Sequence, residues 1–349
     1  MGKNRDARER TSPSRRISPT PVLQPVRGGH TPLLGRRPLV LQFVRPEVVG
    51  VTVSAFPYIG SKTYLAPWIV NHLRDHETFV VPFGGAAGVL LNKHRSKAEI
   101  FNDRDEYVVE FFEVVRDDPE ALAEAIRNIP YSRALYNRWS QRFRTGDQDL
   151  ADDRVERAAR WVFLRYASFS GRYGQRAGFA TDTPRKGPQK SEIWARVPER
   201  IQTIRDRFKG VAIECGDFAE IFDRYDDTDV LFYCDPPYLE EKDNYYRGPL
   251  FDHASLVEAL ETLEGDWAVS YSEPPEGLED LATSAVERDY SRSAGLDNSS
   301  RSERLFLSYD PAATSKFVDA SAAQTTLAQA DGGMDCSANS ESEQDDFKR

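Results

Sequence analysis

Short apolar runs recur between residues 51 and 310 and alternate with amphipathic segments of helical period. The runs at 78–83 and 98–101 each lead into a glycine-rich or acidic turn and then a helical pattern, which is typical of parallel strands joined by helices. The pattern from His253 to Leu263 predicts another amphipathic helix. Further apolar runs predict strands at 211–214, 230–234, 267–271 and 305–308. The chain is therefore expected to form an α/β sheet.

Residues 118–208 interrupt this alternation. They are predicted to form several helices and a polar loop, 168–189, that contains Gly, Arg and Tyr but few aliphatic residues. From Tyr131 to Ala212 there are 18 Lys and Arg against nine Asp and Glu, although the whole chain carries a net charge of −10. Because phosphate contacts need local cationic side chains, this helical insert is a candidate domain for recognising a substrate such as DNA.

The two ends of the chain lack hydrophobic periodicity. Residues 1–50 mix Arg, Pro, Ser and Gly, whereas residues 311–349 are rich in Ala, Ser, Gln and Asp. Both compositions are typical of disorder, and the basic N-terminal segment is interpreted either as a DNA-contacting arm or as an over-extended gene start. The predicted organisation is a catalytic domain from 51–117 and 209–310, with 118–208 inserted into it.

Several classes of protein are disfavoured by composition. No run of eighteen apolar residues is present, and the N-terminus lacks an apolar leader, so we expect a cytoplasmic protein without a membrane partner. The three cysteines have no CxxC spacing and the five histidines are scattered. We therefore expect neither a disulfide framework nor a bound metal.

The strongest chemical signal is Asp235-Pro236-Pro237-Tyr238, directly after the apolar run 230–234. Ligands bind at the carboxyl ends of strands in such sheets. An aromatic exocyclic amine is a poor nucleophile, and the Asp235 carboxylate and the Pro236 carbonyl suit its two protons and the positive charge that develops on its nitrogen. Tyr238 suits stacking on an extruded base. The alternative is an ordinary Pro-Pro turn with an exposed tyrosine.

A second signal is the small-residue turn Pro82-Phe83-Gly84-Gly85-Ala86-Ala87-Gly88. Small residues there allow a cofactor to approach the backbone where a helix begins. Asp103 follows the next strand, about twenty positions later, an arrangement that suits a ribose diol. The alternatives are a tight turn for the glycines and a helix cap for Asn102 or Asp103.

Two weaker signals complete the set. Residues 56–62, FPYIGSK, form an aromatic, glycine and lysine turn before a helix, without the spacing of a P-loop. Cys215-Gly216-Asp217-Phe218 follows the predicted strand at 211–214, where Asp217 and Phe218 suit the edge and face of an adenine. An ordinary Gly-Asp turn is the alternative there.

In this order, the motifs resemble the Dam-like (alpha-class) family of S-adenosylmethionine-dependent DNA adenine-N6 methyltransferases. FPYIGSK, PFGGAAGVLLN, FNDRD, GDF and DPPY are similar to successive family motifs, and 301–309 is similar to the closing strand of the family. Residues 157–179 resemble the segment that enters DNA in these enzymes. The resemblance covers about residues 51 to 310.

This resemblance implies a Rossmann-like methyltransferase sheet with helices on both faces and a mostly helical target-recognition insert. The catalytic residues implied are Asp235, Pro236, Pro237 and Tyr238. The implied S-adenosylmethionine-binding residues are Tyr58, Gly60, Lys62, Phe83, Gly84, Gly85, Asp103, Asp217 and Phe218. The implied residues for double-stranded DNA are Arg165, Ser170, Arg172, Tyr173, Gln175 and Arg176.

The sequence departs from the family pattern at three positions. Val81 stands where an acidic residue commonly precedes Pro-Phe, Ala87 replaces a glycine, and Ser170 replaces an asparagine. The alternatives to adenine-N6 transfer are a cytosine-N4 methyltransferase, because the same acceptors suit any exocyclic amine, and an inactive DNA-binding relative. A cognate restriction nuclease is a further candidate partner.

Overall fold

The computed structural model describes residues 53–58, 60–145, 150–168, 178–181, 189–238, 251–291 and 300–311. The chain divides into two units, 1–49 and 50–349, and every described residue belongs to the second. The predictions of disorder for 1–50 and, apart from Pro311, for 311–349 thus lie outside the described residues. Within the described ranges, no helix has the length and apolar content needed to cross a membrane, and no group of His, Cys, Asp and Glu is arranged to hold a metal.

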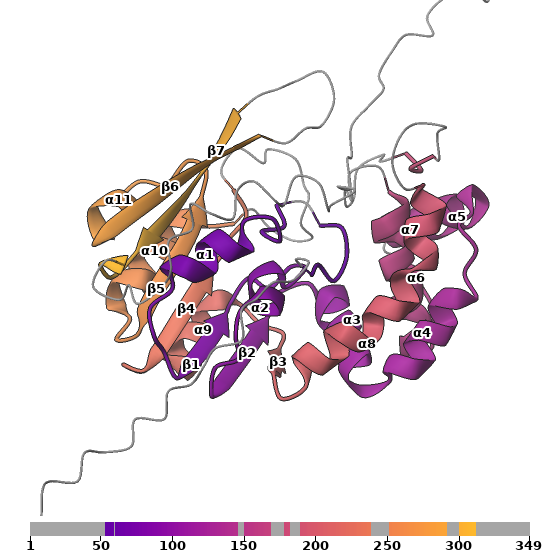
Figure 1. The fold of residues 1–349 in the computed structure, drawn as a ribbon, viewed down its shortest axis with the longest axis horizontal. Helices are drawn as coiled ribbons and strands as arrows, with labels where there is room; N and C mark the ends of the chain where they lie inside the picture. Colours follow the sequence, from indigo (N-terminus) through magenta and orange to yellow (C-terminus); the bar gives the residue numbers. More distant parts are fainter. Residues whose placement is uncertain are drawn as a thin grey trace, which may run out of the picture. The chain divides into compact units, whose positions relative to one another are not determined.

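The described strands form one sheet in the order β3-β2-β1-β4-β5-β7-β6 (Figure 1). The first five of these are parallel, whereas β7 is antiparallel to both β5 and β6. Strand order reverses between β1 and β4, which is where an open α/β sheet binds ligands at its carboxyl ends. The strands are β1 Thr78–Val81, β2 Ala98–Asn102, β3 Ala212–Glu214, β4 Val230–Cys234, β5 Asp266–Tyr271, β6 Ser284–Ser291 and β7 Ser300–Leu307.

The six predicted apolar runs all correspond to strands, and β4 has the predicted bounds. β1 ends at Val81, before the predicted end at 83, and β7 begins well before 305. β6 has no predicted counterpart, because this edge strand reads SAVERDYS and its described side chains are exposed or half-buried. A strand without a buried face carries no apolar run for a sequence pattern to detect.

Side chains alternate between the two faces of the sheet, and each face is covered by helices. Phe79 and Val81 of β1 belong to one hydrophobic cluster, and Val80 belongs to the other. The first cluster includes residues of α1 Ala66–His72, α2 Gly88–Asn92 and α3 Glu106–Asp117; the second includes residues of α9 Phe218–Tyr225, α10 His253–Thr262 and α11 Leu278–Leu281. The predicted Rossmann-like α/β sheet with helices on both faces is confirmed.

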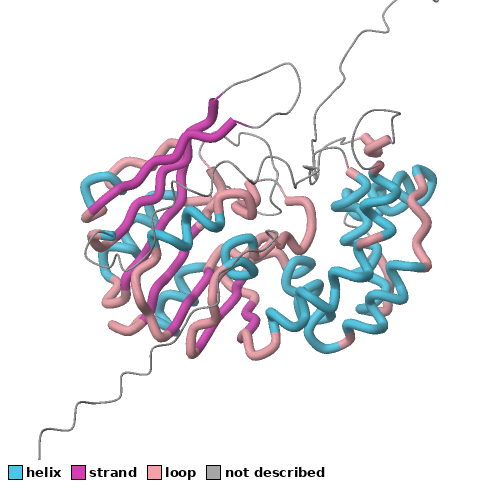
Figure 2. The backbone as a smooth tube through the Cα atoms, in the orientation of Figure 1, coloured by secondary structure: helices cyan, strands magenta, loops and turns pink. Residues whose placement is uncertain are grey.

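The insert is mostly helical where it is described, as Figure 2 shows. Its helices are α4 Pro119–Arg127, α5 Arg133–Thr145, α6 Arg154–Ala167, α7 Lys190–Ala195 and α8 Val197–Phe208. Phe208 of α8 stacks on Phe112 of α3 with ring centroids 4.4 Å apart. The buried aromatic residues Trp161, Phe163 and Trp194 of the insert belong to the same cluster as the sheet residues. The insert therefore shares one hydrophobic core with the sheet.

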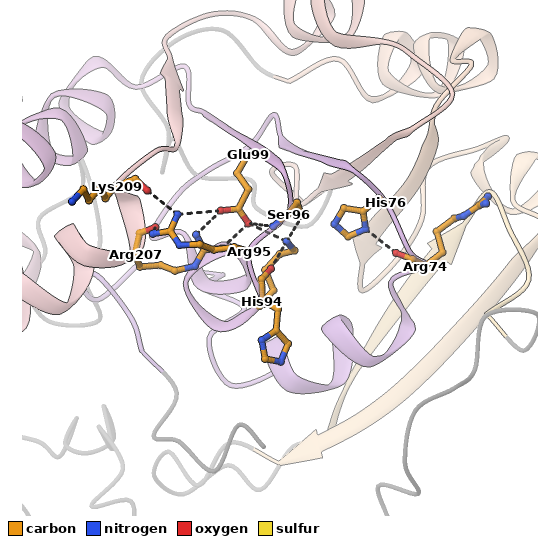
Figure 3. A network of polar contacts seen from close by, with 9 residues as sticks. Arg74, His76, His94, Arg95, Ser96, Glu99, Arg207 and Lys209 are labelled. Atoms are coloured by element: carbon orange, nitrogen blue, oxygen red, sulfur yellow. Dashed lines mark hydrogen bonds and ion pairs between the residues drawn. The ribbon is translucent and has the colours of Figure 1, made fainter. Parts of the chain in front are cut away.

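A buried ionic contact also ties α8 to β2 (Figure 3). The guanidinium of Arg207 donates to both carboxylate oxygens of Glu99, at 2.5 and 2.8 Å, and Lys93 donates to Glu99 at 3.1 Å. Burial alone would raise the pKa of Glu99, but Arg207 and Lys93 outweigh it and hold that pKa below its usual value. Glu99 is thus an ionised anchor for the last helix of the insert.

Candidate active site

The loop after β1 requires residues without side chains. A Cβ on Gly84 would lie 2.3 Å from the ring of Phe101, and Gly85 has a φ of +49°. A Cβ on Gly88 would lie 2.8 Å from the backbone nitrogen of Thr63. Glycine is therefore needed both for the turn itself and for the close approach of the segment that carries Lys62.

Asp103 joins this loop to the end of β2. One of its carboxylate oxygens accepts from the backbone N–H of Gly85 at 2.7 Å, and the other accepts from Asp105 at 2.8 Å. Burial, followed by the charge of Asp105, raises the pKa of Asp103 to about 7. The cap of α3 is Asp105, which accepts from Tyr107, so Asp103 does not serve as the helix cap. The carboxylate of Asp103 instead lies against the glycine loop.

Asn102 connects three of the predicted segments. Its side-chain amide donates to the carbonyl of Pro82 at 2.7 Å and accepts from the backbone N–H of Gly216 at 2.9 Å. This fully buried side chain therefore fixes the loops after β1 and β3 relative to the end of β2. The glycine-rich loop after β1 and the acidic segments after β2 and β3 are far apart in the sequence, but they meet at the carboxyl ends of these strands.

Aromatic side chains line the same region. The rings of Phe83 and Phe218 are 5.6 Å apart, and Phe251 lies 5.4 Å from Phe83. The ring of Tyr58 would lie 3.2 Å from a Cβ on Gly85. A glycine turn, a carboxylate and aromatic faces are the groups that suit the amino-acid, ribose and adenine parts of S-adenosylmethionine, so these residues fit that cofactor.

Three of the predicted cofactor residues lie differently. Asp217 is exposed and caps α9 by accepting from Ala219 at 3.1 Å, so a structural role explains it. Gly60 is exposed with a φ of +74°, and its carbonyl accepts from the Lys62 ammonium at 3.0 Å. Lys62 points to Asp235 rather than to the glycine loop, since its ammonium lies 2.8 Å from Oδ1 of that residue.

Asp235 directly follows the fully buried strand β4, whose sequence VLFYC contains no charged residue. The side chain is 20% exposed, which leaves it open to a ligand. Burial raises the pKa of Asp235, and the positive charge and hydrogen bond of Lys62 oppose that rise. Burial also lowers the pKa of Lys62, but Asp235 and Glu303 outweigh it and raise that pKa, so the lysine is an ammonium.

Tyr238 lies in the same cluster of side chains. Its hydroxyl donates to the carboxylate of Glu303, and its ring lies 4.6 Å from the Lys62 ammonium. The ring of Tyr271 on β5 lies 5.5 Å from it. We call the set of Lys62, Asp235, Tyr238 and Glu303 the Asp235 cluster. The DPPY segment is thus not an isolated Pro-Pro turn, because buried charged side chains hold both of its polar residues.

Glu303 is the member of the Asp235 cluster that the sequence analysis did not single out. It is 1% exposed, and its carboxylate lies 3.7 Å from the Lys62 ammonium. Because β7 runs antiparallel to β5, its first half lies at the carboxyl ends of the parallel strands. Glu303 also has the same parity as the buried residues Leu305 and Leu307. That period of two was the available signal, since it predicts that Glu303 lies on the same face of the sheet as Leu305 and Leu307.

The predicted DNA-contacting residues fall mostly outside the described part of the chain. These are Ser170, Arg172, Tyr173, Gln175 and Arg176. The sixth, Arg165, lies in α6 with 4% exposure and its guanidinium over the ring of Trp161 at 5.0 Å. The structure therefore places Arg165 in the core of the insert rather than on a surface open to DNA.

A mixed sheet of this strand order, with a glycine loop, a carboxylate after the second strand and Asp-Pro-Pro-Tyr after the fourth, defines an S-adenosylmethionine-dependent methyltransferase. A family model described as D12 class N6 adenine-specific DNA methyltransferase matches residues 58–272, more than half of the chain. The chain belongs to this family, whose members are S-adenosylmethionine-dependent enzymes acting on adenine in DNA.

Curated relatives are similar at low identity. The type II methyltransferase M.MjaIII of Methanocaldococcus jannaschii is 26% identical over 199 residues, which cover 52% of this chain and 67% of the relative. The DNA adenine methylase of Escherichia coli K12 is 26% identical over 188 residues, 52% of this chain and 63% of the relative. The modification methylase LlaI of Lactococcus lactis is 27% identical over 223 residues, 60% of this chain and 35% of the relative.

One solved structure, that of SMU.472 in complex with SAH, is 13% identical. The match covers 46% of this chain and 37% of the SMU.472 chain, and its TM-score is 0.20. The fold assignment therefore rests on the strand order of the sheet.

Proposed function

We propose that this chain transfers the methyl group of S-adenosylmethionine to the N6 atom of an adenine flipped out of double-stranded DNA, and that Asp235-Pro236-Pro237-Tyr238 holds that adenine. The observation that carries the proposal is the position of Asp235. Its partly exposed carboxylate already binds an N–H donor, the Lys62 ammonium at 2.8 Å, at the carboxyl end of β4. β4 is hydrogen-bonded to β1, which leads directly into the glycine loop.

The cofactor would be held by the residues gathered around that loop. Gly84 and Gly85 leave the backbone open to it, Asp103 suits the ribose hydroxyls, and Phe83 with Phe218 suits the adenine ring. When bound, S-adenosylmethionine supplies an electrophilic methyl group on a positively charged sulfur. The protein's part is to place the acceptor nitrogen in line with that methyl group.

Asp235 and the Pro236 carbonyl would orient the amino group through its two protons. The nitrogen gains positive charge as the methyl group is attached, and a carboxylate fixed beside it stabilises that charge without reorganisation. Asp235 need not be a strong base, because the methylated nitrogen is much more acidic than the starting amine. Tyr238 would stack on the flipped base in place of its lost neighbours.

The insert would supply most of the contacts to DNA phosphates. Its excess of basic residues includes Arg138 and Arg144, both exposed on α5. Ser170, Arg172, Tyr173, Gln175 and Arg176 remain the proposed residues for reading the target. The names of the type II methyltransferase M.MjaIII and the modification methylase LlaI support a cognate restriction nuclease as a partner, and a DNA substrate supports a cytoplasmic location.

One experiment distinguishes adenine-N6 transfer from cytosine-N4 transfer and from an inactive DNA-binding relative. DNA is isolated from cells that express the chain and from cells that express Asp235→Ala, and both are sequenced by a method that detects methylated bases. N6-methyladenine at a defined site, present only with the unaltered chain, supports the proposal. N4-methylcytosine would favour the cytosine enzyme, and no methylation by a folded chain would favour an inactive relative.

A further inference from the structure

We propose that Glu303 is a positioning residue of the transfer reaction, which receives the Lys62 ammonium when the target amino group takes the place of that ammonium on Asp235. This inference rests on the proposed function and adds a residue and a rearrangement to it. It concerns the Asp235 cluster alone.

The Lys62 ammonium occupies the position that the substrate needs. It lies 2.8 Å from Oδ1 of Asp235, a hydrogen-bond distance to the carboxylate that is proposed to accept from the target amine. A second N–H donor can approach this oxygen in the same direction only if the ammonium moves. The Lys62 ammonium thus lies where the amino group of the target would bind Asp235.

Glu303 is the acceptor within reach of such a movement. Its carboxylate lies 3.7 Å from the Lys62 ammonium, about one ångström beyond a hydrogen bond. The same carboxylate accepts from the Tyr238 hydroxyl, which fixes it beside the ring that would stack on the base. Glu303 is 1% exposed, so water does not replace these partners. A small shift of a flexible lysine therefore exchanges one carboxylate for the other.

The charge of Glu303 has a second consequence. With Lys62 paired to Asp235 alone, the site would carry no net charge to meet the positive charge that develops on the target nitrogen. Burial raises the pKa of Glu303, and the positive charge of Lys62 opposes that rise. Once ionised, Glu303 leaves the Asp235 cluster with one excess negative charge when Lys62 is an ammonium. In a buried site, such a charge acts more strongly than it would in water.

The titratable groups that interact electrostatically with the Asp235 cluster come from several elements, and the substitutions at Glu303 leave them unchanged. They are Lys62 from the segment before α1, Tyr233 and Cys234 from β4, Tyr238 from the turn after it, Tyr271 from β5 and, acting on Lys62, Tyr290 from β6.

The test compares Glu303→Gln, Glu303→Asp and the control Glu287→Gln in the full chain. Gln keeps the size and an acceptor for Tyr238 but removes the charge, whereas Asp keeps the charge. Glu287 lies on the neighbouring strand β6 and is exposed. Single-turnover methylation of DNA is measured from pH 5 to pH 9, together with cofactor affinity by calorimetry and the thermal unfolding midpoint.

For Glu303→Gln we expect a fall in the transfer rate of about tenfold to a hundredfold with unchanged cofactor affinity. Its acid limb should move to lower pH, because Lys62 then serves Asp235 alone. Glu303→Asp should recover part of the rate, and Glu287→Gln should match the unaltered chain. A Glu303→Gln chain with unaltered rate and pH profile would overturn the inference. The inference would also be overturned if the rate of Glu303→Gln fell only in parallel with a lowered unfolding midpoint and Glu303→Asp did not recover it. Absence of methylation by the unaltered chain would instead count against the proposed function.

Discussion

The Lys62 ammonium and the Asp235 carboxylate form an ion pair of 2.8 Å that joins the segment before α1 to the end of β4. The lysine is 5% exposed and the aspartate is 20% exposed, so the pair is sheltered on one side and open on the other. The open side gives another N–H group access to the Asp235 carboxylate when the ammonium moves away from it.

Replacing Asp235 by alanine should abolish methyl transfer, because the proposed acceptor for the target amine is lost. DNA binding should change little, since the basic insert carries most of the charge for phosphate contacts. Incorporation of tritiated methyl groups measures methyl transfer, and a filter-binding or gel-shift titration measures DNA binding. Asp223→Ala, an exposed change on α9, is the matched control. Transfer retained by Asp235→Ala would remove Asp235 from the mechanism.

Replacing Lys62 by methionine should move the acid limb of the rate profile to higher pH. Lys62 opposes the rise in the pKa of Asp235, so its removal raises that pKa further and fewer chains carry the carboxylate at neutral pH. The direction is opposite to that expected for Glu303→Gln. Rates measured across the same pH range check this, and an acid limb that stays in place would show that Lys62 does not tune Asp235.

Replacing Asp103 by asparagine should weaken the binding of S-adenosylmethionine by about tenfold to a hundredfold, the loss of a charged hydrogen bond. The pKa of Asp103 is raised to about 7, so the carboxylate becomes ionised as the pH rises through 7. In the unaltered chain, cofactor affinity should therefore increase from pH 6 to pH 8. Calorimetry should find this increase missing in the asparagine variant. Equal affinity and equal pH dependence in both chains would place the ribose elsewhere.

Replacing Arg207 by alanine should destabilise the protein by about 3 kcal/mol, because it leaves the buried Glu99 without its bidentate partner. The neighbouring change Arg205→Ala should cost less than about 0.5 kcal/mol, since the ion pair of Arg205 is with the exposed Asp206. Urea unfolding of the two variants measures the difference. Equal midpoints would mean that the contact between α8 and β2 does not anchor the insert.

The sheet could be predicted from the sequence because its central strands are buried on both faces and appear as unbroken apolar runs, as in Val230 to Cys234. β6 could not, because only the edge position and the pairing with β7 make SAVERDYS a strand. The helical character of the insert was also predictable. Its union with the sheet in one core was not, because contacts such as Phe208 on Phe112 are long-range.

The site motifs could be predicted because each is a contiguous segment of the sequence. The contacts between their side chains could not, because they join residues far apart in the chain. Asp103 accepts from Gly85 of the glycine loop, and its role at the ribose stays a prediction, whereas Asp217 caps a helix. Lys62 was assigned to the cofactor by its motif, and only the folded chain brings it to Asp235. Glu303 lies just before the apolar run 305–308, so the pattern that predicted this strand did not include it.

Mass spectrometry of nucleosides tests the central claim most directly. The purified chain is incubated with DNA and S-adenosylmethionine carrying a deuterated methyl group, and the DNA is digested to nucleosides. We predict that N6-methyldeoxyadenosine with a deuterated methyl group is found, and that none is found when the Asp235→Ala variant replaces the unaltered chain. Label on the N4 atom of deoxycytidine, or an equal yield of labelled adenine from Asp235→Ala, would contradict the account.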